Sequence, residues 1–219
     1  MKQLTFYFDP ISPYAALAFE ALPDLLTGHH VEVVYRPILL AALLHALGQK
    51  GPAEIEPKRR WTFRQVAWLA HQQGRVLEVP AQHPFNPLPL LRLAWACAAP
   101  AGQPGDTPNR WVVEQLFHHV WQGGGADAVA PDRLVALSAR LAPAQEATGE
   151  AVKQRLRTET EAALALGVFG VPMLELDGRL FWGQDALPML RAALEGDPWF
   201  DSGPWEAAGQ PRPGVVRRH

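Results

Sequence analysis

Residues 4–15 read LTFYFDPISPYA and contain a strand, a sharp break and the start of a helix. Apart from Leu4, residues 4–8 are β-branched or aromatic, which predicts a buried strand. The prolines that follow Asp9 end this strand. Ser12 is a good N-cap residue and Pro13 suits the first helical position, so we expect a helix to begin here. Apolar residues then recur at helical spacing as far as Gly28, a typical residue just after a helix.

A second strand follows this helix. Residues 31–36, VEVVYR, have the composition of a strand and are ended by Pro37. Two strands that are joined by a helical crossover pair in parallel. We therefore expect the chain to open with a β-α-β unit whose two strands are neighbours.

The far end of the chain returns to strands. Residues 167–172, GVFGVP, lead into a short strand at 173–176, and Asp177-Gly178 is a strong two-residue hairpin turn. A second strand is expected at 179–182. Gly183-Gln184-Asp185 then starts a last helix over residues 186–194. The pattern predicts an antiparallel hairpin followed by a helix.

The middle of the chain, between about residues 39 and 166, has almost no strand pattern. Caps and first-position prolines predict helices over residues 58–73, 88–98, 109–122, 133–141 and 148–166. The order β-α-β, helices, β-β-α is that of an α/β thioredoxin-like fold, in which a large all-helical insertion interrupts a four-stranded mixed sheet.

This element order also predicts the domain organisation. We expect a discontinuous thioredoxin-like domain formed by residues 1–40 and 166–200. Residues 41–165 would form the inserted helical domain. Residues 201–219 are rich in Pro and Gly and are expected to form an irregular tail, part of it packed down by aromatic residues.

Composition excludes several classes of protein. The chain has 20 Lys and Arg against 22 Asp and Glu, a net charge of -2, so it lacks the basic surface that binds nucleic acid or an anionic membrane. No apolar run reaches the roughly 18 residues that a membrane helix needs. The N-terminus lacks the apolar core and cleavage site of a signal peptide, from which we expect a cytoplasmic protein.

Cys97 is the only cysteine of the chain. An intramolecular disulfide, a C-x-x-C redox site and a cysteine zinc cluster are therefore excluded. Cys97 lies in an apolar helical pattern and is expected to be buried in the core. The eight histidines have no spacing of the H-E-x-x-H kind, so we predict no metal site.

Several motifs taken together resemble one family. They are residues 6–9 with Ser12-Pro13-Tyr14, residues 36–40, 57–59, 83–88 with Leu91-Arg92, 167–172 and 177–185. On these motifs the chain resembles the DsbA-like branch of the thioredoxin superfamily. Within that branch it is similar to the 2-hydroxychromene-2-carboxylate isomerases and their relatives, the kappa-class glutathione transferases. The resemblance covers about residues 4–195.

The resemblance implies a special conformation at Val171-Pro172. In thioredoxin folds the proline at this place is cis and faces the active turn, and an X-Pro bond is the only kind in which cis is cheap. The alternative is an ordinary trans proline that opens an edge strand. We expect the cis bond.

The resemblance also implies a catalytic role for Ser12. In disulfide oxidoreductases of this branch the turn reads Cys-x-x-Cys, and here Ser12 and Ala15 stand at those two positions. A serine cannot form the mixed disulfide that thiol exchange requires. A hydroxyl at a helix N-terminus can instead donate a hydrogen bond to a bound thiolate, which the helix dipole also stabilises. The simpler interpretation is that Ser12 is only an N-cap.

Glutathione is the cofactor that the resemblance implies. An extended peptide can pair with the backbone before a cis-proline as an added strand, and Gln184 with Asp185 can hold the carboxylate and ammonium of a γ-glutamyl group. Trp182 would contribute wall contacts, unless it belongs to the hairpin core. The three cations of residues 58–60 begin a helix, where positive charge is unfavourable, and this suggests that they bind an anion. Such runs are more often a solvent-exposed face. The predicted glutathione-binding residues are Val171, Pro172, Trp182, Gln184, Asp185, Gln49 and Lys58.

Three further residues are predicted to meet the substrate: Tyr14, Asn86 and Arg92. Asn86 is equally suited to cap the helix after Pro87. Two positions depart from the family pattern. Gln49 stands where the family often has asparagine, and Gln65 stands where an acidic residue is common. Both changes are compatible with glutathione binding and bear on which substrate is accepted.

The sequence thus predicts a glutathione-dependent isomerase of the 2-hydroxychromene-2-carboxylate isomerase type. The resemblance implies that the thiolate of bound glutathione adds reversibly to a conjugated aromatic carboxylate, a form of nucleophilic catalysis that belongs to aromatic catabolism. Three alternatives stay open. They are a kappa-like glutathione transferase acting on electrophiles, a DsbA-like oxidoreductase, which the missing cysteine pair disfavours, and a glutathione- or peptide-binding module without catalysis. Members of the family are often homodimers, and the sequence leaves this open.

Overall fold

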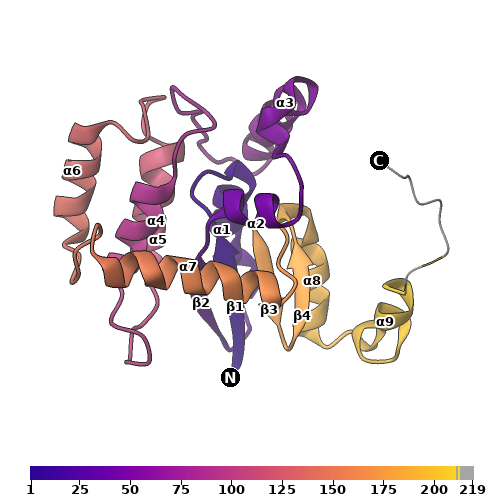
Figure 1. The fold of residues 1–219 in the computed structure, drawn as a ribbon. Coiled ribbons are helices and arrows are strands. Elements are labelled where there is room, and N and C mark those ends of the chain that lie inside the picture. The colour runs from indigo at the N-terminus through magenta and orange to yellow at the C-terminus, as the bar shows by residue number, and fades with distance from the viewer. Residues whose placement is uncertain (211, 213–219) are drawn as a thin grey trace.

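The protein is built around a mixed four-stranded sheet in the order β2-β1-β3-β4 (Figure 1). The computed structural model describes residues 1–210 and 212. Strand β1 (Lys2–Phe8) is parallel to β2 (Val31–Pro37) and antiparallel to β3 (Met173–Leu176), which forms a hairpin with β4 (Arg179–Trp182). The predicted α/β thioredoxin-like fold and its parallel β1–β2 pair are confirmed.

Nine α-helices accompany the sheet within the described residues. They are α1 (Pro13–Leu26), α2 (Leu40–Ala46), α3 (Glu56–Gln72), α4 (Leu88–Ala96), α5 (Arg110–Trp121), α6 (Pro131–Leu141), α7 (Glu150–Ala165), α8 (Leu187–Glu195) and α9 (Pro204–Ala208). Three short 3-10 helices, Pro52–Glu54, Gln184–Ala186 and Pro198–Phe200, lie between them. Helix α2 was not predicted, and the tail expected to be irregular contains α9. Residues 211 and 213–219 of that tail lie outside the described residues.

The sheet separates two apolar layers because alternate residues of a strand point to opposite faces. Leu4, Phe6 and Phe8 of β1 point into the layer that contains α1, α5 and α8. Tyr7 and Met173 point to the other face, where they pack with residues of α2 and α7. Figure 1 shows α7 crossing the sheet on that second face.

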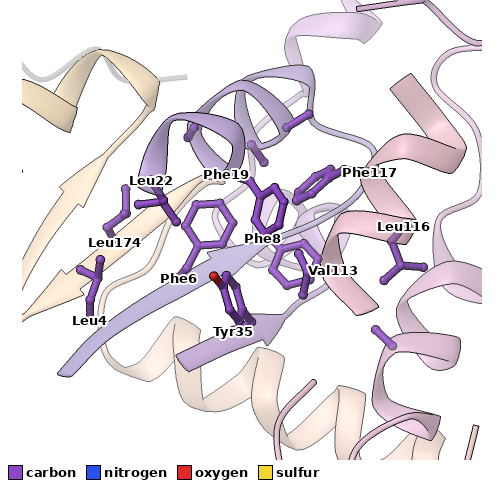
Figure 2. Packing of buried hydrophobic residues seen from close by; sticks show 14 of the residues in the cluster. Leu4, Phe6, Phe8, Phe19, Leu22, Tyr35, Val113, Leu116, Phe117 and Leu174 are labelled. Atoms are coloured by element: carbon purple, nitrogen blue, oxygen red, sulfur yellow. The ribbon is translucent and has the colours of Figure 1, made fainter. Parts of the chain in front are cut away.

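An aromatic cluster joins the sheet to the helical insertion (Figure 2). Phe117 of α5 lies 5.3 Å from Phe8 of β1 and 5.2 Å from Phe19 of α1, measured between ring centroids. Phe6 and Tyr35 extend the cluster along the strands. The hydrophobic core therefore continues from the sheet into the insertion without interruption.

The C-terminal aromatics pack against the hairpin, as the sequence suggested. Trp205 of α9 contacts Phe181 of β4, with ring centroids 5.7 Å apart, and also packs on Phe200. Arg179 donates a hydrogen bond to the carbonyl of Phe200. Within the part of the chain that the structure describes, no helix is both long and apolar enough to cross a bilayer.

Candidate active site around Ser12

Ser12 is the N-cap of α1 and lies beneath the surface at the carboxyl end of β1. Its Oγ accepts a hydrogen bond from the Ala15 amide at 3.2 Å, which satisfies one of the free donors of the first helical turn. The hydroxyl can donate to the carbonyl of Val171, 3.4 Å away, which is long for an O–H···O bond. Ser12 is 6% exposed. The Ser12 hydroxyl therefore donates at most a weak hydrogen bond within the protein.

The loop before β3 forms the other side of this site. The Val171-Pro172 bond is cis, as predicted, and the carbonyl of Val171 faces Ser12. The carbonyl of Pro172 accepts from Gly183, which ties this loop to the end of the hairpin. The amide of Val171 has no hydrogen-bond partner among the described residues. An amide without a protein partner can bond to water or to the backbone of a ligand.

Trp182 stands beside the same loop. Its indole lies so close to Gly170 that a side chain at Gly170 would collide with the indole nitrogen. Phe169 packs edge-on against Trp182, with ring centroids 4.9 Å apart. Trp182 is 56% exposed, so the interpretation that placed it in the hairpin core is wrong. The two rings form an exposed aromatic wall next to Val171.

Gln184 and Asp185 lie in a 3-10 turn rather than at the first turn of α8, which begins at Leu187. The turn packs against α1, the helix that Ser12 caps. Gly183 has a φ of 93°, and its missing side chain leaves room for the Asp185 carboxylate. Asp185 is exposed, and its side chain has no hydrogen-bond or ion-pair partner within the described residues.

Tyr14 connects α1 with α3. Its hydroxyl donates a hydrogen bond of 2.7 Å to Oε1 of Gln65. Burial raises the pKa of Tyr14, an effect opposed by the Thr62 hydroxyl and reinforced by the negative charge of Asp185. Tyr14 therefore stays neutral, and the structure brings Tyr14, Gln65 and Asp185 together.

The remaining predicted residues lie on neighbouring segments. Lys58 is exposed in the first turn of α3 and makes no ion pair with any described residue, whereas the nearby Arg60 pairs with Glu56. An open surface hollow of about 380 Å³ lies on the same helix and is lined by Glu56, Pro57, Arg60, Trp61 and Arg64, without Lys58. Gln49 is exposed in the turn after α2, and its backbone amide bonds to Leu44.

Asn86 and Arg92 differ in how far their polar groups are satisfied. Oδ1 of Asn86 accepts from the Leu88 amide at 3.1 Å, so its side chain supports the start of α4, although Pro87 rather than Asn86 is the N-cap residue. Nε of Arg92, on α4, is buried and has no hydrogen-bond partner among the described residues. This nitrogen is closed off from solvent in the described structure, so an anion could meet only the other guanidinium nitrogens of Arg92.

Asp9 is a feature that the sequence analysis missed. Its side chain is completely buried between β1 and the active turn. Oδ1 accepts from the Ile11 amide at 3.1 Å, and Oδ2 accepts from the Leu40 amide at 3.0 Å. Burial raises the pKa of the Asp9 carboxyl to about 7, although these two bonds lower it. An acidic residue between a strand and a proline resembles an ordinary turn residue, and only the continuing apolar pattern on both sides could have indicated burial.

The raised pKa of Asp9 predicts a pH-dependent stability. The folded protein binds a proton at Asp9 up to about pH 7, while the unfolded chain releases it near pH 3.8. The free energy of unfolding should therefore fall as pH rises through this range, by about 2.5 kcal/mol from pH 5 to 7.5. The Asp9→Asn variant should lack this component. Urea unfolding of both proteins across this range measures it, and parallel pH profiles would contradict the assignment.

Cys97 lies in the helical insertion, at the end of α4, and is half-buried rather than fully buried as predicted. Burial raises the pKa of its thiol to about 11, so it is a poor nucleophile at neutral pH. Among the described residues no group of three or more His, Cys, Asp and Glu side chains could hold a metal ion.

The site around Ser12 combines a serine N-cap with a facing cis-proline loop in a thioredoxin-like fold. A protein-family model described as "DSBA-like thioredoxin domain" matches residues 3–195 of this chain. The chain is 31% identical over 201 residues to a 2-hydroxychromene-2-carboxylate isomerase from Sphingobium xenophagum, covering 88% of this chain and 98% of that protein. It is 26% identical over 214 residues to glutathione S-transferase kappa 1 from Rattus norvegicus, covering 91% and 93%.

A solved 2-hydroxychromene-2-carboxylate isomerase has the same fold, with a TM-score of 0.75 and 24% identity over 91% of this chain and 98% of that one. The protein belongs to the DsbA-like thioredoxin family, and within it to the 2-hydroxychromene-2-carboxylate isomerase group. Relatives named for an isomerase and for a transferase indicate an enzyme.

Proposed function

We propose that the protein is a glutathione-dependent isomerase that acts on 2-hydroxychromene-2-carboxylate or a closely similar conjugated aromatic carboxylate. The observation that carries the proposal is the Ser12 hydroxyl at the N-terminus of α1. It faces the cis-proline loop and donates only a weak hydrogen bond there. The Sphingobium relative named for this isomerisation supports the substrate class. The kappa-class relative supports glutathione.

The residues around Ser12 fit glutathione. The unpaired amide of Val171 suits the backbone of an extended peptide, which can bind there as an added strand. Gln184 and Asp185 suit the γ-glutamyl end, because a carboxylate pairs well with an ammonium group. Lys58, which has no ion-pair partner among the described residues, suits a carboxylate. Trp182 would cover the ligand from the side, and Gln49 is the remaining candidate contact.

Glutathione, when bound, supplies a thiol nucleophile. Ser12 already accepts a hydrogen bond from Ala15, so its remaining task is to donate its proton, and a thiolate is a better acceptor than the distant Val171 carbonyl. The dipole of α1 adds partial positive charge at the same place. Together these effects favour the thiolate over the thiol and so raise its reactivity at neutral pH.

On the substrate side, Arg92 suits the carboxylate because its guanidinium is a charged donor that makes no ion pair with a described residue. Tyr14 and Asn86 have their side chains bonded to Gln65 and Leu88, so they would act as walls or through a second hydrogen bond. Gln65 takes the place of an acidic residue, which removes a negative charge that a substrate carboxylate would otherwise meet.

The test is the isomerisation of 2-hydroxychromene-2-carboxylate, followed by absorbance with and without glutathione. We expect turnover that requires glutathione while the total thiol concentration stays constant, because an isomerase returns its cofactor. Equal turnover without glutathione, or none with it, would contradict the proposal.

A second candidate function is glutathione transfer to electrophiles, which the kappa-class relatives favour. A transferase consumes one thiol for each product formed, whereas an isomerase consumes none. An aryl halide or an enone assayed for thiol loss therefore separates the two. Loss of thiol with electrophiles and no isomerisation would establish the transferase instead.

A further inference from the structure

Two side chains of the helical insertion hold the backbone immediately before Ser12. Nε1 of Trp121, at the end of α5, donates a hydrogen bond of 2.9 Å to the carbonyl of Pro10. Nε2 of His83, in the segment between α3 and α4, lies 2.9 Å from the carbonyl of Ile11. Both contacts reach the turn from sequence positions more than seventy residues away.

The other polar groups of this turn are satisfied by Asp9. Its carboxylate accepts from the Ile11 amide, and its own carbonyl accepts from the Ser12 amide at 3.0 Å. Pro10 has no amide hydrogen to place. Every backbone donor and acceptor from the Asp9 carbonyl to the Ser12 amide therefore has a partner, and the insertion supplies the partners of both intervening carbonyls.

The hydrogen bond of His83 determines which ring nitrogen carries the hydrogen. A carbonyl can only accept, so Nε2 must carry the hydrogen. Nδ1 is then a bare acceptor, buried and without a partner among the described residues. The ring packs against Phe63 and Trp121, with centroids 5.1 and 5.7 Å away, and burial lowers the pKa of His83, so the neutral ring is retained. The indole of Trp121 is also held in place, because it is only 2% exposed.

We propose that His83 and Trp121 are positioning residues for Ser12, which hold the carbonyl dipoles of Pro10 and Ile11 away from the reacting group. Without these donors the two oxygens are free to reorient, and an oxygen turned toward Ser12 would repel a thiolate there. The helical insertion thereby sets the anion-stabilising strength of the active turn. The inference rests on the proposed function in taking Ser12 as the group that meets the thiolate, but its test does not require glutathione.

The test places a thiol at the site as a probe. In the Ser12→Cys variant the pKa of the new thiol is read from thiolate ultraviolet absorbance, and Cys97 does not interfere because its pKa is about 11. We expect this pKa to lie below the usual cysteine value of about 8.5. Adding Trp121→Phe, or His83→Phe, should raise it by about one unit, a tenfold loss of thiolate at a given pH. Adding His83→Gln, which restores an amide donor, should recover part of the shift.

Trp111→Phe is the matched control, because Trp111 lies on the same helix, is half-exposed and makes no hydrogen bond to a described residue through its indole. It should leave the thiol pKa unchanged. A folded Trp121→Phe or His83→Phe protein, judged by circular dichroism, whose thiol pKa equals that of the parent would overturn the inference. Glutathione binding to the wild-type protein is measured separately. Failure to bind would refute the proposed function while the thiol series still decides the role of His83 and Trp121.

Discussion

Replacement of Ser12 by alanine is expected to lower kcat/KM for the glutathione-dependent reaction by roughly 10–100-fold. Ser12→Ala removes a hydrogen bond to a charged group, which is worth about 1.5–3 kcal/mol, and each 1.4 kcal/mol corresponds to a factor of ten. The loss should be smaller at high pH, where the thiol ionises without help. Steady-state kinetics between neutral and alkaline pH measure both effects.

The control for this prediction must separate chemistry from helix capping. Loss of the N-cap bond to Ala15 costs about 1 kcal/mol of stability, whereas glycine at an N-cap costs only a few tenths. Ser12→Gly should therefore lose as much activity as Ser12→Ala while remaining more stable. Ser202→Ala, which removes a serine bonded to the Pro198 carbonyl in the tail, should leave kcat/KM unchanged. Wild-type kinetics in Ser12→Gly would contradict the role of Ser12.

The largest effect on stability is expected at Phe117. Its ring is 1% exposed and packs between Phe8 of β1 and Phe19 of α1, where the sheet meets the insertion (Figure 2). Phe117→Ala should lower the free energy of unfolding by about 3–5 kcal/mol, because the lost contacts leave a cavity. Urea unfolding followed by circular dichroism measures the change.

The same substitution at a half-exposed phenylalanine provides the comparison. Phe169→Ala removes mainly the contact with Trp182, which is worth roughly 1 kcal/mol for an aromatic pair. A Phe117→Ala effect no larger than that of Phe169→Ala would refute the view that the sheet and the insertion share one core. Two separate unfolding transitions in the wild type would refute it equally.

Local signals account for the parts of the fold that the sequence predicted well. The Ser12-Pro13 cap and the Asp177-Gly178 turn act on neighbouring residues, so α1 and the β3–β4 hairpin could be located without knowledge of the rest of the chain. Both strands of the hairpin have the predicted limits.

Helix α2 escaped prediction because its support is not local. Its N-cap residue, Leu39, provides no side-chain hydrogen bond, and the acceptor for the Leu40 amide is the carboxylate of Asp9. A capping interaction across 31 residues leaves no pattern in the sequence around α2. The buried state of Asp9 was missed for the same reason, since α2 completes its surroundings.

The candidate site likewise has features that could be predicted from the sequence and features that could not. The cis Val171-Pro172 bond and its approach to Ser12 were predicted through the family resemblance, and the structure confirms the bond. The contacts of His83 and Trp121 with the active turn could not be predicted, because they depend on how the insertion packs against the sheet. An indole or imidazole in a helical region usually indicates core packing, and only the three-dimensional arrangement identifies its hydrogen-bond partner.

The most direct test of the central claim is glutathione binding by calorimetry, with the pKa of the bound thiol followed through its ultraviolet absorbance. The proposed site predicts binding with a thiol pKa below that of free glutathione, since the Ser12 hydroxyl and the N-terminus of α1 both favour the thiolate. The absence of binding at millimolar glutathione, or a bound thiol with an unchanged pKa, would contradict it.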